Sequence, residues 1–249
     1  MNRIVLVIVS VVLLVFGSIA VGQTQDAIKS GAADVEKGWQ ALDIPLLEKS
    51  LTSFEEMAKK DPKDYQAPYY QAMAHFAIAD SLDIKSEEEF DQSGKSDEHV
   101  DKALELIKTA QGLKEDSVDI YILKFQIIRR KMFHVSFPGL MMYVADRTAT
   151  YEKAKELAPD NTSVQIISAI QVAEGGWPPP PPEKPIAEFE KLVKKDPKLA
   201  DAYYHMGYIW DKAKKVDDAK KNYEKALELN PNHHWAKKRL KGLSASAGT

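Results

Sequence analysis

The stretch that decides the fold is ADAYYHMGYIWDKAKKVDDAKKNYEKALELNPNH, residues 200–233. Its apolar residues recur three and four positions apart, which is the period of an amphipathic helix. Small residues at Gly207, Ala219 and Ala226 allow two antiparallel helices to approach closely. Pro231 ends the second helix and turns the chain. The stretch therefore predicts one tightly packed helix pair.

Aromatic residues complete the pattern of this unit. Tyr203, Trp210 and Tyr223 are spaced to fill the space between the helix pair and its neighbour. Together with the small residues and the closing proline, they fall at each usual signature position of the tetratricopeptide repeat. The chain thus resembles exported bacterial proteins built from tetratricopeptide repeats (TPR). The resemblance is specific over residues 200–233 and degenerate over the rest of the mature chain.

The ending of this unit recurs earlier in the chain. Similar endings are MAKKDPKD from Met57, GLKEDSVD from Gly112, ELAPDNTS from Glu156 and LVKKDPKL from Leu192. Only the last interval, from Pro197 to Pro231, has the TPR period of about 34 residues, so the earlier repeats contain insertions. We predict an all-α fold, a right-handed TPR-type superhelix (alpha solenoid) of about five helix pairs plus a C-terminal capping helix.

Apolar spacing places the helices of each pair. The first helices are expected near 24–42, 65–79, 118–133, 163–174 and 199–213, the second helices near 45–60, 98–113, 140–157, 185–195 and 216–229, and the capping helix near 232–244. The basic run of the capping helix, Lys237, Lys238, Arg239 and Lys241, is expected to be its solvated side rather than a nucleic-acid patch.

Three long connectors lie inside repeats, at residues 81–97, 134–139 and 175–184. Equivalent loops of a repeat array project from the same edge, and insertions on one face often build the binding surface. We therefore expect the three connectors to share one edge.

Each connector has its own chemistry. The first is rich in carboxylates but lacks the alternating ligands of a calcium loop, so we expect a solvated acidic loop. The second carries His134, Phe137, Met141, Met142 and Tyr143, which are typical of core, with pocket lining as the alternative. The third, EGGWPPPPPEKP, predicts a stiff polyproline strap onto which Trp177 packs; a ligand for a polyproline-reading domain is the alternative.

The N-terminus predicts export. Residues 1–22 combine Arg3, an apolar run and small residues before Gln23, as in a signal peptide; an uncleaved N-terminal membrane anchor is the alternative. Residues 23–244 are expected to form the TPR-like domain and residues 245–249 a disordered tail. In either case the folded part is expected outside the cytoplasm, periplasmic or extracellular, with membrane contact only through an uncleaved segment.

Composition excludes several function classes. A net charge of -3 argues against a nucleic-acid partner, and the absence of cysteine excludes disulfides, thiolate metal sites and a lipidated N-terminal cysteine. The sequence has no nucleophile elbow, phosphate loop or metalloprotease helix. His233 and His234 form a weak metal pair, and His205 is expected to pack. We therefore predict no catalytic residue, no cofactor and no metal, and a protein that is not an enzyme.

The family resemblance implies binding to a protein or peptide through a concave groove lined by the first helices. The side chains at matching positions depart from the two-lysine, two-asparagine clamp that holds terminal carboxylates in some members, and their tyrosines suit extended peptides or stacked ligands. With Trp177 of the third connector added, the candidate partner-binding residues are Tyr70, Gln126, Arg129, Trp177, Asp201, Tyr204, Tyr208, Asp211 and Lys212.

Two functions follow. The first is a non-catalytic protein interaction module or scaffold of the cell envelope, which binds a partner segment through the groove or the connector edge. The second is a small-molecule or glycan-binding accessory protein of an envelope transport or uptake system, because the layout also resembles exported helical-repeat components of tripartite solute transporters. An open groove with exposed tyrosines favours the first. A deep apolar cavity with a few convergent polar groups favours the second.

Overall fold

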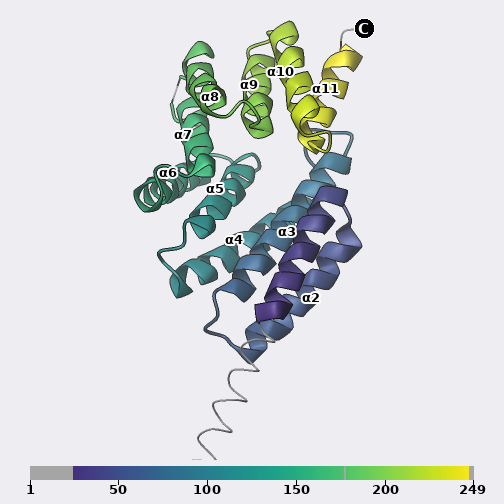
Figure 1. Ribbon diagram of the computed structural model, residues 1–249, viewed down its shortest axis with the longest axis vertical. Coiled ribbons are helices and arrows are strands. Elements are labelled where there is room, and N and C mark those ends of the chain that lie inside the picture. The colour runs from purple at the N-terminus through teal and green to yellow at the C-terminus, as the bar shows by residue number, and fades with distance from the viewer. Residues whose placement is uncertain (1–24, 177, 247–249) are drawn as a thin grey trace, which may run out of the picture. The chain divides into compact units, whose positions relative to one another are not determined.

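The computed structural model describes residues 25–176 and 178–246 (Figure 1). The predicted signal sequence and Trp177 lie outside these residues. The described residues form helices, turns and loops without a strand, which confirms the all-α prediction. After a helix at 25–41 come α2 (Ile44–Lys60), α3 (Gln66–Lys85), α4 (Lys95–Leu113), α5 (Val118–Met132), α6 (Gly139–Leu157), α7 (Thr162–Glu174), α8 (Glu183–Lys195), α9 (Ala200–Lys212), α10 (Val216–Leu229) and α11 (His234–Ser246).

Local sequence signals explain where several helices begin. The side chain of Asp43 accepts a hydrogen bond from the Leu46 backbone N–H at 3.1 Å and caps α2. Asn161 caps α7 in the same way, accepting from Ser163 and Val164 at 2.9 and 3.2 Å. These caps fix the starts of α2 and α7, whereas α5, α6, α8, α9 and α10 begin without a side-chain cap bond.

A few boundaries differ from the prediction. α3 continues to Lys85, past the expected end at Ala79, so the first connector is shorter than predicted. α8 begins at Glu183, which leaves Pro185 in its first turn, where a proline is tolerated. α11 continues to Ser246. None of the helices in the described part of the chain combines the length and apolar character needed to cross a membrane.

The described chain divides into two compact units. The first unit contains residues 25–81 and 95–115, and the second contains 82–94 and 116–246. The first connector therefore belongs largely to the second unit, although the helices on either side of it belong mainly to the first.

In the first unit, glycines and aromatic rings set the helix packing. A Cβ atom on Gly31 would lie 2.7 Å from the Phe54 ring, so the helix at 25–41 approaches α2 closely there. Phe54 is fully buried and stacks on Tyr70 of α3 at 5.2 Å between ring centroids. Tyr70, predicted as a groove residue, therefore packs against a core ring.

In the second unit, neighbouring helices pack in chain order: α5 on α6, α7 on α8, α8 on α9, α9 on α10, and α10 on α11 (Figure 1). A Cβ atom on Gly207 would lie 2.6 Å from the Tyr223 ring, and Tyr223, Ala219 and Ala226 are fully buried. The close helix approach predicted from these small residues is confirmed.

Glu87, Glu88 and Glu89 of the acidic loop are exposed to solvent, as predicted, but the loop is also anchored at its two ends. Asp83, at its start, is fully buried and accepts from Arg130 Nε of α5 at 2.6 Å. Phe90 packs on Phe133 with 4.8 Å between ring centroids, and the Arg130 guanidinium lies 4.5 Å from the Phe90 ring. An ion pair and an aromatic contact fix the loop to its own unit.

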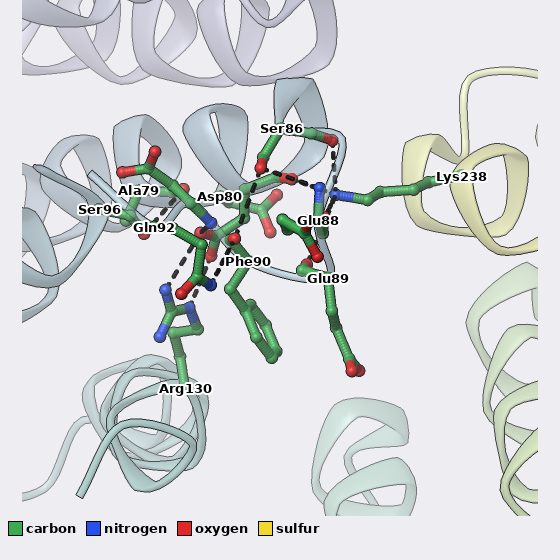
Figure 2. A network of polar contacts seen from close by, with 12 residues as sticks. Ala79, Asp80, Ser86, Glu88, Glu89, Phe90, Gln92, Ser96, Arg130 and Lys238 are labelled. Carbon is green, nitrogen blue, oxygen red and sulfur yellow. Dashed lines mark hydrogen bonds and ion pairs between the residues drawn. The ribbon is translucent and has the colours of Figure 1, made fainter. Parts of the chain in front are cut away.

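The basic side of α11 holds the same loop. Lys238 Nζ donates to the backbone carbonyls of Asp83, Ser86 and Glu88, the latter two at 3.0 and 2.5 Å (Figure 2). Arg239 forms an ion pair with Glu89. The prediction that this basic run is merely solvated is wrong for Lys238 and Arg239, because their partners lie about 150 residues away in sequence and leave no periodic signal.

Candidate functional site

The second unit contains a cavity of about 790 Å³. Three prolines of the strap, Pro179, Pro180 and Pro182, line it together with Leu140, Phe189 and other apolar side chains from α5 to α9. Concave sites with mostly apolar walls and a few polar groups are the usual geometry of ligand sites. The predicted polyproline strap is thus part of the wall of a cavity.

Two arginines and one glutamate provide the main charges of the lining. Glu174, the last residue of α7, accepts from Arg129 Nε of α5 and from Arg147 Nη1 of α6, both at 2.8 Å. The Glu174 backbone carbonyl accepts a further bond from Arg147 Nη2 at 3.3 Å. The side chains of Arg147, Arg129 and Glu174 are 2%, 17% and 25% exposed. One carboxylate thus joins two guanidinium groups from different helices.

Both arginines remain cationic. Burial opposes the charge of Arg129, but the Glu174 carboxylate more than offsets it, so the pKa of Arg129 lies above its ordinary value. Burial lowers the pKa of Arg147, and the Glu174 carboxylate offsets only part of this lowering. A guanidinium is protonated throughout the physiological range, so the triad has a net charge of about +1.

His205 contributes a neutral ring. It is buried and stacks on Phe189, with 5.5 Å between ring centroids. Burial, assisted by the Arg129 charge, lowers the pKa of His205 to about 3. The ring therefore adds no charge to the lining at neutral pH. The packing role expected for this residue agrees with its position.

The structure brings some predicted site residues together. Arg129, Tyr208 and Lys212 line the cavity. Tyr204 lies beside them, with its ring centroid 6.5 Å from that of Tyr208. Burial raises the pKa of Tyr208, and the Lys212 ammonium lies 5.3 Å from the Tyr208 ring. Four predicted residues thus share the region around the cavity.

The other predicted residues lie elsewhere. Asp201 is 3.3 Å from His233 Nε2, just before α11, and Asp211 accepts from the Tyr223 hydroxyl of α10 at 3.4 Å, so both carboxylates have partners outside the cavity lining. Gln126 is half-buried on α5 and is not among the lining residues. Tyr70 belongs to the first unit, and Trp177 is outside the described residues.

Sequence reasoning missed Arg147 and Glu174, although Arg147 left a signal. Arg147, Thr150, Tyr151 and Ala154 are three and four residues apart and are all buried on one face of α6. An arginine within the apolar face of a helix requires a partner, since an unpaired buried charge is very costly. Glu174 left no equivalent signal, because it looks like an ordinary helix end.

The first two connectors contact each other in the second unit, whereas the shared edge of all three connectors stays a prediction. Phe90 of the acidic loop contacts Phe133 and His134, with the His134 ring centroid at 5.6 Å. Phe133 and the strap prolines line the same cavity. The expected core character of the second connector is wrong, however, since Phe137, Met141 and Met142 are 75%, 54% and 75% exposed.

Comparison with known proteins supports the fold. Residues 200–233 match the family described as tetratricopeptide repeat. A thermophilic TPR protein of Thermus thermophilus, TTC0263, is 16% identical with a TM-score of 0.63, covering 89% of this chain and 99% of that chain. Human IFIT1, solved as a dimer with m7Gppp-AAAA, is 17% identical with a TM-score of 0.59, covering 86% of this chain and 46% of that chain. The sequence matches none of the curated proteins compared with it.

At these identities the solved structures show the fold alone. Together with the helix pairs of the described residues, they confirm a TPR-like all-α solenoid fold. Folds of this class generally serve as scaffolds for protein interactions and present extended binding surfaces.

Proposed function

We propose that this protein is a non-catalytic binding protein that acts outside the cytoplasm and holds a small organic molecule in the cavity of its second unit. The observation that carries this proposal is the cavity, whose volume of about 790 Å³ lies within the range typical of small-molecule sites. Its walls are mainly apolar, and two of its charged groups, Arg129 and Arg147, converge on Glu174.

The lining suits a small molecule better than a buried peptide. A peptide backbone taken out of water must find partners for its N–H and C=O groups. Four of the lining residues are prolines, which lack a backbone donor, and most of the others have apolar side chains. An organic molecule with a single polar head makes fewer demands on such a wall.

The location outside the cytoplasm rests on the signal-like sequence of residues 1–22. It fits an accessory role in uptake or transport across the envelope. Fractionation of cells that express the full-length chain tests it, and recovery of the protein only from the cytoplasm would overturn it.

A cavity-filling variant tests the site. Ala213 lines the cavity at the end of α9, so we expect Ala213→Phe to occupy part of its volume. Ala187 of α8 is exposed and does not line the cavity, so Ala187→Phe is the matched control. We expect mass spectrometry of the purified protein, after denaturation, to release a small molecule from the wild type and the control but not from Ala213→Phe. Equal release from all three, or from none, would contradict the proposal.

A second candidate function is the binding of a protein partner in the envelope. The TPR match favours it, and so do the exposed side chains of Phe137, Met141 and Met142 near the start of α6. Changing all three residues to serine and crosslinking in envelope fractions tests this candidate. We expect loss of a specific crosslinked partner if it is right, and an unchanged pattern if it is wrong.

A further inference from the structure

The charges that line the cavity are not balanced. Arg129, Arg147 and Lys212 are cationic, whereas Glu174 is the single carboxylate among the described lining residues. Glu89, outside the lining, pairs with Arg239 and lies 3.5 Å from Lys212. Adding both Glu89 and Arg239 makes four cations against two carboxylates, so the excess of two positive charges remains.

The most buried part of this excess lies at the triad. Lys212 is 53% exposed, so water and salt screen its charge. Arg129 and Arg147 are far less exposed, and they share Glu174. Two guanidinium groups against one carboxylate leave one net positive charge, in a region where desolvation strengthens electrostatic interactions. The triad is therefore matched to one monovalent anion.

Donors are also left over at the triad. Arg147 Nε is buried and has no hydrogen-bond partner in the described part of the chain. Arg129 donates to Glu174 through Nε, so its two terminal nitrogens lie outside that bond. A guanidinium has five N–H donors, and its fork matches a planar carboxylate. The triad thus has both the charge and the donor capacity to take an additional carboxylate.

We propose that the cavity binds a monocarboxylate with an apolar body, an inference that rests on the proposed small-molecule function. The Arg129–Arg147 pair binds the carboxylate beside Glu174, and the strap prolines, Leu140 and Phe189 contact the apolar body. A monocarboxylate suits the site better than a phosphate, because the single net charge of the triad matches one negative charge. The neutral ring of His205 has no negative charge, so it does not compete with the ligand for the arginines.

Decanoate and its uncharged isostere decanamide are the probes. We expect isothermal titration calorimetry on the protein produced from the full-length chain to show at least about tenfold tighter binding of decanoate, the range expected for a hydrogen bond to a charged group. In Arg129→Gln, the remaining Arg147–Glu174 pair is balanced, so we expect the variant to fold and to lose the preference for decanoate. Lys191→Gln, on the exposed side of α8 and paired with Glu188, is the matched control and should retain it.

A second measurement does not depend on any variant. We expect the 13C NMR titration of [1-13C]decanoate to show that binding lowers its carboxyl pKa, because the arginines favour the anion. Binding in a merely apolar cavity would raise this pKa by desolvation.

Each alternative outcome has a distinct meaning. Equal binding of decanoate and decanamide, or a raised carboxyl pKa, would overturn the carboxylate inference while the small-molecule function stands. Tighter binding of decyl phosphate than of decanoate would overturn the preference for a monocarboxylate. No binding of any probe, combined with no small molecule released from the purified protein, would overturn both proposals.

Discussion

The two compact units bury different kinds of polar group. In the first unit, His75 and His99 share a hydrogen bond of 2.8 Å between their Nδ1 atoms, and Ser81 donates to the Ala77 carbonyl at 2.7 Å. In the second unit, the corresponding contacts are ionic, as in the buried pair of Arg130 with Asp83. The fully buried polar residues of the first unit are thus uncharged, although Trp39 donates to the part-buried Asp80 at 2.7 Å. The second unit instead buries charges that are paired between helices far apart in sequence.

The difference matters for function. Uncharged buried groups that are paired with their neighbours stabilise a core and leave nothing for a ligand. The second unit instead combines a cavity with more arginine charge than its glutamate compensates. Departures from ideal packing and charge pairing are expected at functional sites. The candidate site therefore lies in the less regular unit, within the part of the chain that the structure describes.

Removing the central carboxylate of the triad should have the largest effect on stability, because it leaves the buried charges of the second unit without their partner. In Glu174→Ala, Arg129 and Arg147 lose their shared partner, and two buried cations face each other without compensation. We expect a loss of about 3 kcal/mol in the free energy of unfolding, at the low end for a broken buried pair because Glu174 is partly exposed. Urea denaturation measures it. The exposed Glu190→Ala on α8 should cost less than about 0.5 kcal/mol, and a similar cost for both would contradict the role of the triad.

Adding one methyl group at the closest helix contacts should affect both units alike. The Cβ atom of Gly31→Ala meets Phe54 in the first unit, and that of Gly207→Ala meets Tyr223 in the second. Both rings are fully buried, so we expect each change to cost about 2 kcal/mol by overpacking. Gly112→Ala, on the exposed side of α4 with no atom near, should instead stabilise by about 0.5 kcal/mol. A cost at only one of the two contacts would show that the units differ in packing as well as charge.

The sequence predicted what depends on local period and spacing. Gly207, Ala219 and Tyr223 are near one another in the chain and obey the TPR signature, so their packing followed from their positions. The helix starts capped by Asp43 and Asn161 were predicted to within a few residues for the same reason. Short-range rules are sufficient here because each repeat is one local unit.

The site depended on contacts that no local rule describes. Glu174 bonds to Arg129 and Arg147, which are 45 and 27 residues away, and Lys238 bonds to carbonyls about 150 residues away. Such pairs have no fixed spacing, so a single sequence cannot reveal them. The cavity itself arises from side chains of five helices and the strap, which only the packed structure brings together.

The histidine pair of the first unit should make the free energy of unfolding depend on pH. Burial, and then the charges of His99 and Lys102, lower the pKa of His75 to about 4 from its ordinary value near 6.5. The unfolded chain therefore binds a proton that the folded protein excludes, so this stability is present above pH 6.5 and is lost as the pH falls toward 4. We expect His75→Gln to reduce the loss of unfolding free energy between pH 7 and 5 by about 1 kcal/mol. Urea denaturation at each pH measures this free energy. The same pH dependence in His75→Gln and the wild type would contradict the shifted pKa.

The smallest effect should come from releasing the acidic loop of the second unit. Lys238→Met keeps the apolar stem but removes the ammonium that donates to the carbonyls of Ser86 and Glu88, while the Arg130–Asp83 pair remains (Figure 2). We expect the amides of residues 86–94 to exchange roughly three- to tenfold faster, with global stability changed by less than about 1 kcal/mol. Hydrogen exchange with mass spectrometry measures this, and the exposed Lys237→Met is the matched control. If the loop amides were equally protected in both variants, Phe90 and Asp83 would hold the loop without α11. The functional ionic contacts of the second unit would then be its buried pairs alone.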